Sequence, residues 1–142
     1  MKRFLFVFTL ILITVSFASA QQQTAENEAE KVSENDAVLK VIDESVHDFG
    51  TIQESDGPVT HTFKIKNEGK TPLVVTKVVA SCGCTASEWT KEPIASGKTG
   101  EIKVTYDPAG RPQPFSKTVS VYSNGKTGSY VLTIKGVVEG KQ

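Results

Sequence analysis

The stretch that decides the fold reads Val59-Thr60-His61-Thr62-Phe63-Lys64-Ile65-Lys66. Apolar and polar side chains alternate along this run, and a period of two is typical of a β-strand with one buried face. We expect Val59, Phe63 and Ile65 to point into a core, and His61 shares their phase. The run therefore predicts a half-buried strand rather than a helix.

Similar patterns lie on both sides of this run. Towards the N-terminus, residues 39–42 and 46–52 indicate a broken first strand. Residues 73–80 are apolar in both phases, which predicts a central strand that is covered on both faces. Towards the C-terminus, three more inward-facing sets follow with the same period: Ile102, Val104 and Tyr106; Phe115, Val119 and Val121; Tyr130, Leu132 and Ile134.

Turn signals separate these strands. Residues 67–72, 93–100 and 109–114 are rich in glycine, proline and small polar residues, and Asn124-Gly125 predicts a hairpin. Gly136, within the last strand, predicts a bulge or a close approach of backbone. About seven short strands in roughly 100 residues is the pattern of an all-β immunoglobulin-like sandwich, with a small closed barrel as the alternative.

The first 38 residues differ from the rest. Residues 1–20 have a basic start, an apolar run and the small residues Ala18-Ser19-Ala20, as a secretory signal peptide cleaved after Ala20 does. The alternative is a membrane anchor, but the apolar run is shorter than the roughly 20 residues that span a bilayer. Residues 21–38 are polar and acidic and predict a flexible linker to a domain at 39–139. We therefore expect an exported protein, periplasmic or extracellular, with no stable membrane anchor after cleavage.

Composition excludes some functions. The formal net charge is zero, and the basic residues are scattered, so no nucleic-acid partner is expected. The chain has no nucleophile elbow, no phosphate-binding glycine loop and no His-Glu-x-x-His motif. We therefore expect neither an enzyme nor a cofactor.

Both cysteines of the chain lie in the run Ser81-Cys82-Gly83-Cys84-Thr85. Cα atoms two positions apart can satisfy disulfide geometry, and Gly83 would relax so small a ring. Such a ring limits the unfolded chain little, because its closure contributes only about 1.6 kcal/mol. The favoured role of Cys82 and Cys84 is structural, with Ser81, Gly83 and Thr85 supporting the loop.

Two chemical roles stay open for this pair. A reducible disulfide could serve thiol exchange, with Lys77 and Lys91 as the nearest cations in sequence. Two thiolates could also supply half of a zinc site or a Cu(I) site, for which His47 and His61 are the only histidines. No metal site is predicted, since nothing places the histidines beside the loop. Trp89 is interpreted as a packing residue rather than a ligand contact.

Six segments together resemble the DUF1573 family of exported bacterial proteins: Asp48–Ile52, Phe63–Gly69, Pro72-Leu73, Ser81–Thr85, Ile102–Tyr106 and Val119–Asn124. The family is similar in pattern to ASPM/SPD-2/Hydin and major-sperm-protein type domains. The resemblance covers residues 45–139, and Ser81–Thr85 is its most specific part. It implies an immunoglobulin-like fold and export, and it implies no activity.

These observations favour a non-catalytic binding or structural module of the bacterial cell envelope. The expected partner is another envelope protein or a surface glycan, bound through sheet edges or end loops. The alternative is a thiol-redox or metal-handling protein that acts through Cys82 and Cys84.

Overall fold

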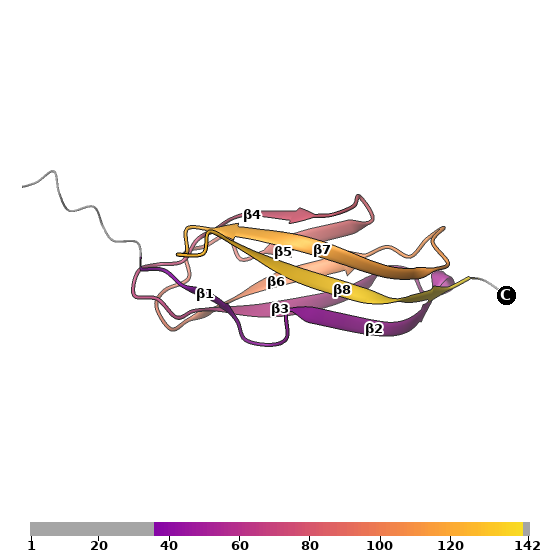
Figure 1. The fold of residues 1–142 in the computed structure, drawn as a ribbon, viewed down its shortest axis with the longest axis horizontal. Helices are drawn as coiled ribbons and strands as arrows, with labels where there is room; N and C mark the ends of the chain where they lie inside the picture. The colour runs from indigo at the N-terminus through magenta and orange to yellow at the C-terminus, as the bar shows by residue number, and fades with distance from the viewer. Residues whose placement is uncertain (1–35, 141–142) are drawn as a thin grey trace, which may run out of the picture. The chain divides into compact units, whose positions relative to one another are not determined.

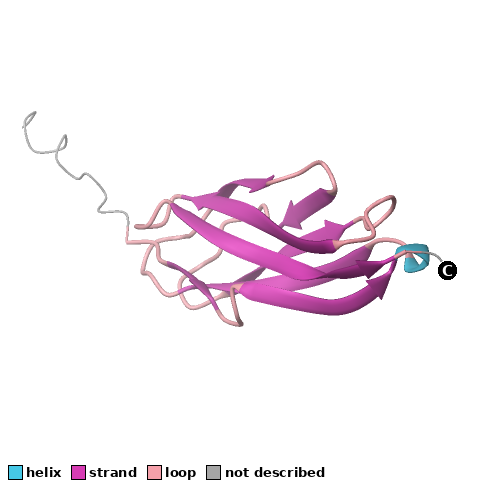
Figure 2. Cartoon of the chain, turned by 45° about the vertical axis from the view of Figure 1, so that its right-hand side comes forward, coloured by secondary structure: helices cyan, strands magenta, loops and turns pink. Residues whose placement is uncertain are grey.

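A computed structural model describes residues 36–140, which are almost entirely strands and connecting loops (Figures 1 and 2). The strands are β1 (Leu39–Val41), β2 (Val46–Gln53), β3 (Val59–Asn67), β4 (Val75–Ala80), β5 (Thr85–Trp89), β6 (Thr99–Tyr106), β7 (Pro114–Ser123) and β8 (Ser129–Glu139). The single short 3-10 helix of this part of the chain, η1, spans Glu54–Asp56.

The strands form two four-stranded sheets that pack face to face as a sandwich. One sheet has the order β1-β3-β6-β5 and the other has the order β2-β8-β7-β4. The broken first strand crosses between them, because β1 pairs antiparallel with β3 whereas β2 pairs parallel with β8. The predicted immunoglobulin-like sandwich is confirmed, and the sheets do not close into a barrel.

Alternation along the strands builds the core. The residues predicted to point inward on β6 and β7, and Phe63 and Ile65 on β3, are buried. Leu132 and Ile134 on β8 are fully buried, while Tyr130 is half-buried. The rings of Tyr106 and Phe115 stack across the two sheets with their centroids 4.0 Å apart.

The prediction of a central strand at residues 73–80 is wrong. β4 is an edge strand of its sheet, and Val79 lies on its outer side with 39% of its surface exposed. A bulge between Val75 and Lys77 shifts the register of β4. Residues on both sides of this bulge therefore point inward in opposite phases, which makes the run look apolar on both faces.

The packed chain begins before Leu39. Ala37 is fully buried, and the backbone N–H groups of Glu68 and Lys70 donate to the carbonyls of Val38 and Asp36. Gly69 lies directly against this segment, since a Cβ atom there would come within 1.8 Å of the Asp36 carbonyl oxygen. Residues 36–38, which the sequence assigned to the linker, thus pack on the domain.

The hairpin between β7 and β8 is confirmed, but its turn is longer than a two-residue Asn-Gly turn. It runs from Asn124 to Gly128, and Gly128 rather than Gly125 has a positive φ of 69°. The side chain of Asn124 reaches across to the chain before β4, where it accepts from the Val74 N–H and donates to the Pro72 carbonyl.

The predicted signal peptide and residues 21–35 of the predicted linker lie outside the described residues. Within residues 36–140, no helix has the length and hydropathy needed to cross a membrane. The described chain enters at one end of the sandwich, beside β1, and leaves from the opposite end after β8 (Figure 1).

Candidate thiol site at the β4–β5 connection

The Cys-Gly-Cys run connects the edge strands of the two sheets. Cys82 and Cys84 form a disulfide with a Cα–Cα distance of 5.3 Å, within the range expected from their spacing. The loop lies at the end of the sandwich opposite to the end where the described chain begins (Figure 1).

The backbone around the disulfide is held on both sides by hydrogen bonds. Ser81 donates its N–H to the Thr118 carbonyl on β7, and the Thr118 N–H donates back to Ser81 Oγ. Beyond the disulfide, the Asp107 N–H donates to the Cys84 carbonyl. Ser81 is therefore joined to β7 through both its backbone and its hydroxyl.

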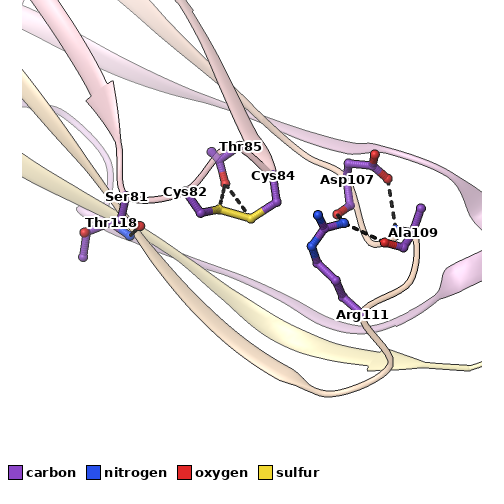
Figure 3. Close-up of a disulfide and its surroundings, with 8 residues drawn as sticks. All are labelled: Ser81, Cys82, Cys84, Thr85, Asp107, Ala109, Arg111 and Thr118. Atoms are coloured by element: carbon purple, nitrogen blue, oxygen red, sulfur yellow. Dashed lines mark hydrogen bonds between the residues drawn. A yellow bond between two sulfur atoms is a disulfide. The ribbon is translucent and has the colours of Figure 1, made fainter.

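The two sulfurs have different surroundings. Both cysteines are half-buried, but Cys84 packs against the hydrophobic core and Cys82 does not belong to that cluster. Thr85 is buried, and its Oγ1 lies 3.5 Å from Cys82 Sγ and 4.0 Å from Cys84 Sγ (Figure 3). A single hydroxyl thus faces both sulfurs. Gly83 is exposed, and apart from its neighbours Cys82 and Cys84 no heavy atom would lie within 4 Å of a Cβ atom there.

A cation that the sequence did not indicate is linked to the disulfide loop through hydrogen bonds. Arg111, on the β6–β7 loop, donates from Nη1 to the carbonyls of Asp107 and Ala109 (Figure 3). Asp107 is the residue whose N–H bonds to Cys84, so two hydrogen bonds link the guanidinium to the disulfide loop. Burial raises the pKa of neighbouring Tyr106, and the charge of Arg111 opposes that shift.

The lysines considered from the sequence have other surroundings. The Lys91 ammonium lies 2.9 Å from the centre of the Trp89 ring, and Lys77 pairs with Tyr122 on the outer face of its sheet. Trp89 packs partly against the core and donates its Nε1–H to the Val75 carbonyl. The packing interpretation of Trp89 therefore agrees with its contacts.

The two histidines lie together near the edge of the sandwich formed by β1 and β2, rather than beside the cysteines. Their rings stack with centroids 3.6 Å apart, and Phe49 and Phe63 pack edge-on against them. Burial, followed by the charge of His47, lowers the pKa of His61. Among residues 36–140, no three His, Cys, Asp or Glu side chains are grouped to hold a metal ion.

A second candidate surface was missed by sequence reasoning. Val79 on β4, Tyr122 on β7 and Val131 on β8 lie on the outer face of one sheet, with 39%, 43% and 53% of their surfaces exposed. Ser120 lies between the valines, since it pairs with both of them. We call these three apolar residues the outer-face patch. Its sequence signal was the presence of apolar residues at positions of β4 and β8 whose alternation points them to solvent.

The opposite outer face is charged. There Lys103 on β6 pairs with Thr62 and Glu88, and its ammonium lies 3.4 Å from the Glu88 carboxylate. Lys64 and Glu101 pair directly beside this group. The sandwich thus has one charged outer face and one outer face with an apolar patch.

Together these features define an immunoglobulin-like β-sandwich with a disulfide loop at one end. The chain belongs to the DUF1573 family, described as a protein of unknown function, whose model matches residues 40–138. No curated protein matches the chain in sequence.

Solved structures share the fold at low identity. A Porphyromonas gingivalis W83 protein of unknown function is similar with a TM-score of 0.61 and 16% identity, over 71% of this chain and 46% of that one. The Vibrio cholerae VesB protease is similar with a TM-score of 0.54 and 18% identity, over 74% of this chain and 32% of that one. The chain spans less than half the length of each of these proteins, and the likeness shows the fold alone.

Proposed function

We propose that this chain is an exported, non-catalytic binding module of the cell envelope, and that its partner is another envelope protein. The outer-face patch carries this proposal, because uncovered apolar side chains that gather on one face often mark a protein interaction site. The signal peptide predicted at residues 1–20 supports export.

The patch has the composition of a small interface. One aromatic and two aliphatic residues form it, with Ser120 between the two valines and with Lys77 and Ser129 on either side of Tyr122. Tyrosine supplies a large contact area and a hydroxyl at little cost in conformational entropy. A protein partner that covers this patch would remove its apolar surface from water and keep the polar rim hydrated.

A surface glycan is the second candidate partner. The ring of Tyr122 is 43% exposed, and an exposed aromatic ring offers a flat apolar face against which a sugar can pack. The valines beside it favour a protein over a glycan, since aliphatic side chains form no directed contact with sugar hydroxyls.

Photo-crosslinking in cells that make the protein tests the surface and the partner class together. A photoreactive benzoylphenylalanine replaces Val131 in the patch or, as a matched control, Lys103 on the charged face. We expect a discrete protein adduct from position 131 and none from position 103. Equal crosslinking from both faces, or a glycan adduct only, would contradict a protein partner at this patch.

Export is tested separately by the intact mass of the protein purified from the envelope. We expect the mass of a chain that begins at Gln21, because a signal peptidase would cut after Ala20. An uncleaved chain found in the cytoplasm would contradict export.

A further inference from the structure

Hydrogen bonds hold the chain on both sides of the disulfide ring. The two bonds between Ser81 and Thr118 hold the chain before the ring, and the bond from Asp107 to Cys84 holds the chain after it. None of these bonds involves a sulfur atom. Reduction of the disulfide would therefore leave the loop attached to β7 and β6 on either side.

The ring is partly exposed to solvent. Gly83 is exposed and both cysteines are half-buried, and Cys82 lies outside the core cluster against which Cys84 packs. The loop is at the end of the sandwich that faces away from the start of the described chain (Figure 1). A thiol could thus reach Cys82 Sγ without displacing the core.

The surroundings can stabilise a freed thiolate. The Thr85 hydroxyl lies near both sulfurs and is able to donate to whichever one carries the charge (Figure 3). A hydrogen bond to a charged acceptor is stronger than a neutral one, and it favours the thiolate as a leaving group. The Arg111 guanidinium lies further out, since it donates to the Asp107 carbonyl, and the Asp107 N–H in turn donates to the Cys84 carbonyl.

We propose that the Cys82–Cys84 disulfide is a thiol-exchange site for a dithiol protein. A partner thiolate attacks Cys82 Sγ, the Cys82–Cys84 bond breaks, and Cys84 leaves as the thiolate. The second partner thiolate then attacks the partner sulfur of the mixed disulfide and releases Cys82. The partner is oxidised by two electrons to a disulfide, and the Cys82–Cys84 pair is reduced by two electrons to thiols.

This inference does not rest on the outer-face patch. The patch lies on the outer face of a sheet, whereas the exchange site lies at an end loop, so either can fail without the other. The exchange site would form a covalent bond with its partner, which we expect to be an exported protein with a pair of neighbouring cysteines.

The first test is reduction of the folded wild-type protein by dithiothreitol, a simple dithiol. Free thiols are counted by alkylation and intact mass, and folding is followed by circular dichroism and by the Trp89 fluorescence. We expect complete reduction with both signals retained. The proposal is overturned if the disulfide opens only in denaturant, or if reduction unfolds the protein.

The second test uses single-cysteine variants with glutathione disulfide. Cys84→Ser leaves the sulfur that lies outside the core cluster, and Cys82→Ser leaves the one that packs against the core. We expect the Cys84→Ser variant to form the mixed disulfide with glutathione at least tenfold faster than the Cys82→Ser variant. Equal rates, or no adduct from Cys84→Ser while it remains folded, would contradict attack at Cys82.

The third test addresses Thr85 as a positioning residue. Thr85→Val removes the hydroxyl at nearly constant volume, and Thr85→Ser keeps it. We expect Thr85→Val to slow reduction by dithiothreitol about fivefold to tenfold and Thr85→Ser to restore the rate, as the loss of one charge-assisted hydrogen bond would do. Equal rates in both variants, with both folded, would remove Thr85 from the site.

Discussion

At the scale of single residues, Asn67 is the polar group on which the fold depends most. Its amide is fully buried and joins four separate points of the chain. It accepts from the N–H groups of Gly69 and Val38, and it donates to the carbonyls of Thr71 and Ile94. The loop that follows β3, the segment before β1 and the β5–β6 loop are thereby fixed to the end of β3.

We predict that Asn67→Ala destabilises the protein by roughly 3 kcal/mol, because it leaves several buried polar groups without partners. Urea unfolding measures the loss. Asn124→Ala is the matched control, since Asn124 also makes two amide hydrogen bonds to backbone but is exposed, and it should cost about 1 kcal/mol. Equal losses in the two variants would show that burial of Asn67 adds nothing.

The histidine pair predicts a dependence of stability on pH. The pKa of His61 is lowered in the folded state by burial and then by His47, with Asp43 acting in the opposite direction. The unfolded chain therefore binds the proton more readily, near pH 6.5. Stability should be full above about pH 6.5 and should fall as the pH decreases below it.

Urea unfolding at several pH values between about 7 and 5 checks this prediction. His61→Phe should flatten the decrease, and NMR titration of the wild type should place the His61 midpoint below about 6.5. Asp36 and Asp48 affect stability in a separate, more acidic pH range. A hydrogen bond from Lys126 lowers the pKa of Asp36, and one from the Gly50 N–H lowers that of Asp48. A His61 midpoint at or above the unfolded value would contradict the effect of burial.

The burial of strand residues was easier to predict than the contacts of loop residues. The alternation of Phe63 and Ile65 indicated burial correctly, because strand phase alone determines it. The turn composition at residues 67–72 gave no sign that the first of them is buried, since two of its four partners, Val38 and Ile94, come from other segments of the chain. Arg111 was missed for the same reason, because its position depends on the path of the β6–β7 loop.

At the scale of elements, Gly136 sets how closely β2 can approach β8. A Cβ atom there would lie 2.8 Å from the Gly50 carbonyl oxygen and 3.0 Å from the Phe115 ring. Gly136→Ala should therefore destabilise the protein by about 1–3 kcal/mol, as overpacking does. Gly83→Ala, in open space, is the control and should change the free energy of unfolding by less than about 0.5 kcal/mol. Similar losses of stability in the two variants would contradict a close approach of β2 to β8 at Gly136.

The same elements show where pattern reading fails. Gly136 was correctly suspected from its place within a strand, since a glycine there often marks a close backbone contact. The position of β4 was not predictable, because a bulge and a doubly covered strand produce the same run of apolar residues. Only the pairing with β7 distinguishes the two, and pairing is a long-range property.

At the scale of the whole molecule, strand number and alternation were enough for the class of fold, and turn spacing distinguished it from helical classes. They did not show that the first strand divides between the two sheets, although the polar residues between its halves allow the crossing. The clustering of Val79, Tyr122 and Val131 likewise follows from register. A candidate interface built across three strands cannot be read from any one of them.

The start of the domain gives the last prediction. Ala37 is fully buried, and the backbone at Asp36, Ala37 and Val38 accepts hydrogen bonds from Lys70, Lys126 and Glu68. A chain that begins at Leu39 should therefore be roughly 3 kcal/mol less stable than one that begins at Asp36, given about 1 kcal/mol for each lost bond.

Urea unfolding of three chains tests this assignment. A chain that begins at Gln21 should match the one that begins at Asp36, because a polar linker adds no buried surface. If the chain that begins at Leu39 is as stable as the other two, then residues 36–38 add nothing to the free energy of unfolding and are part of the linker. If the chain from Gln21 is the most stable, residues 21–35 contribute contacts of their own and are more than a linker.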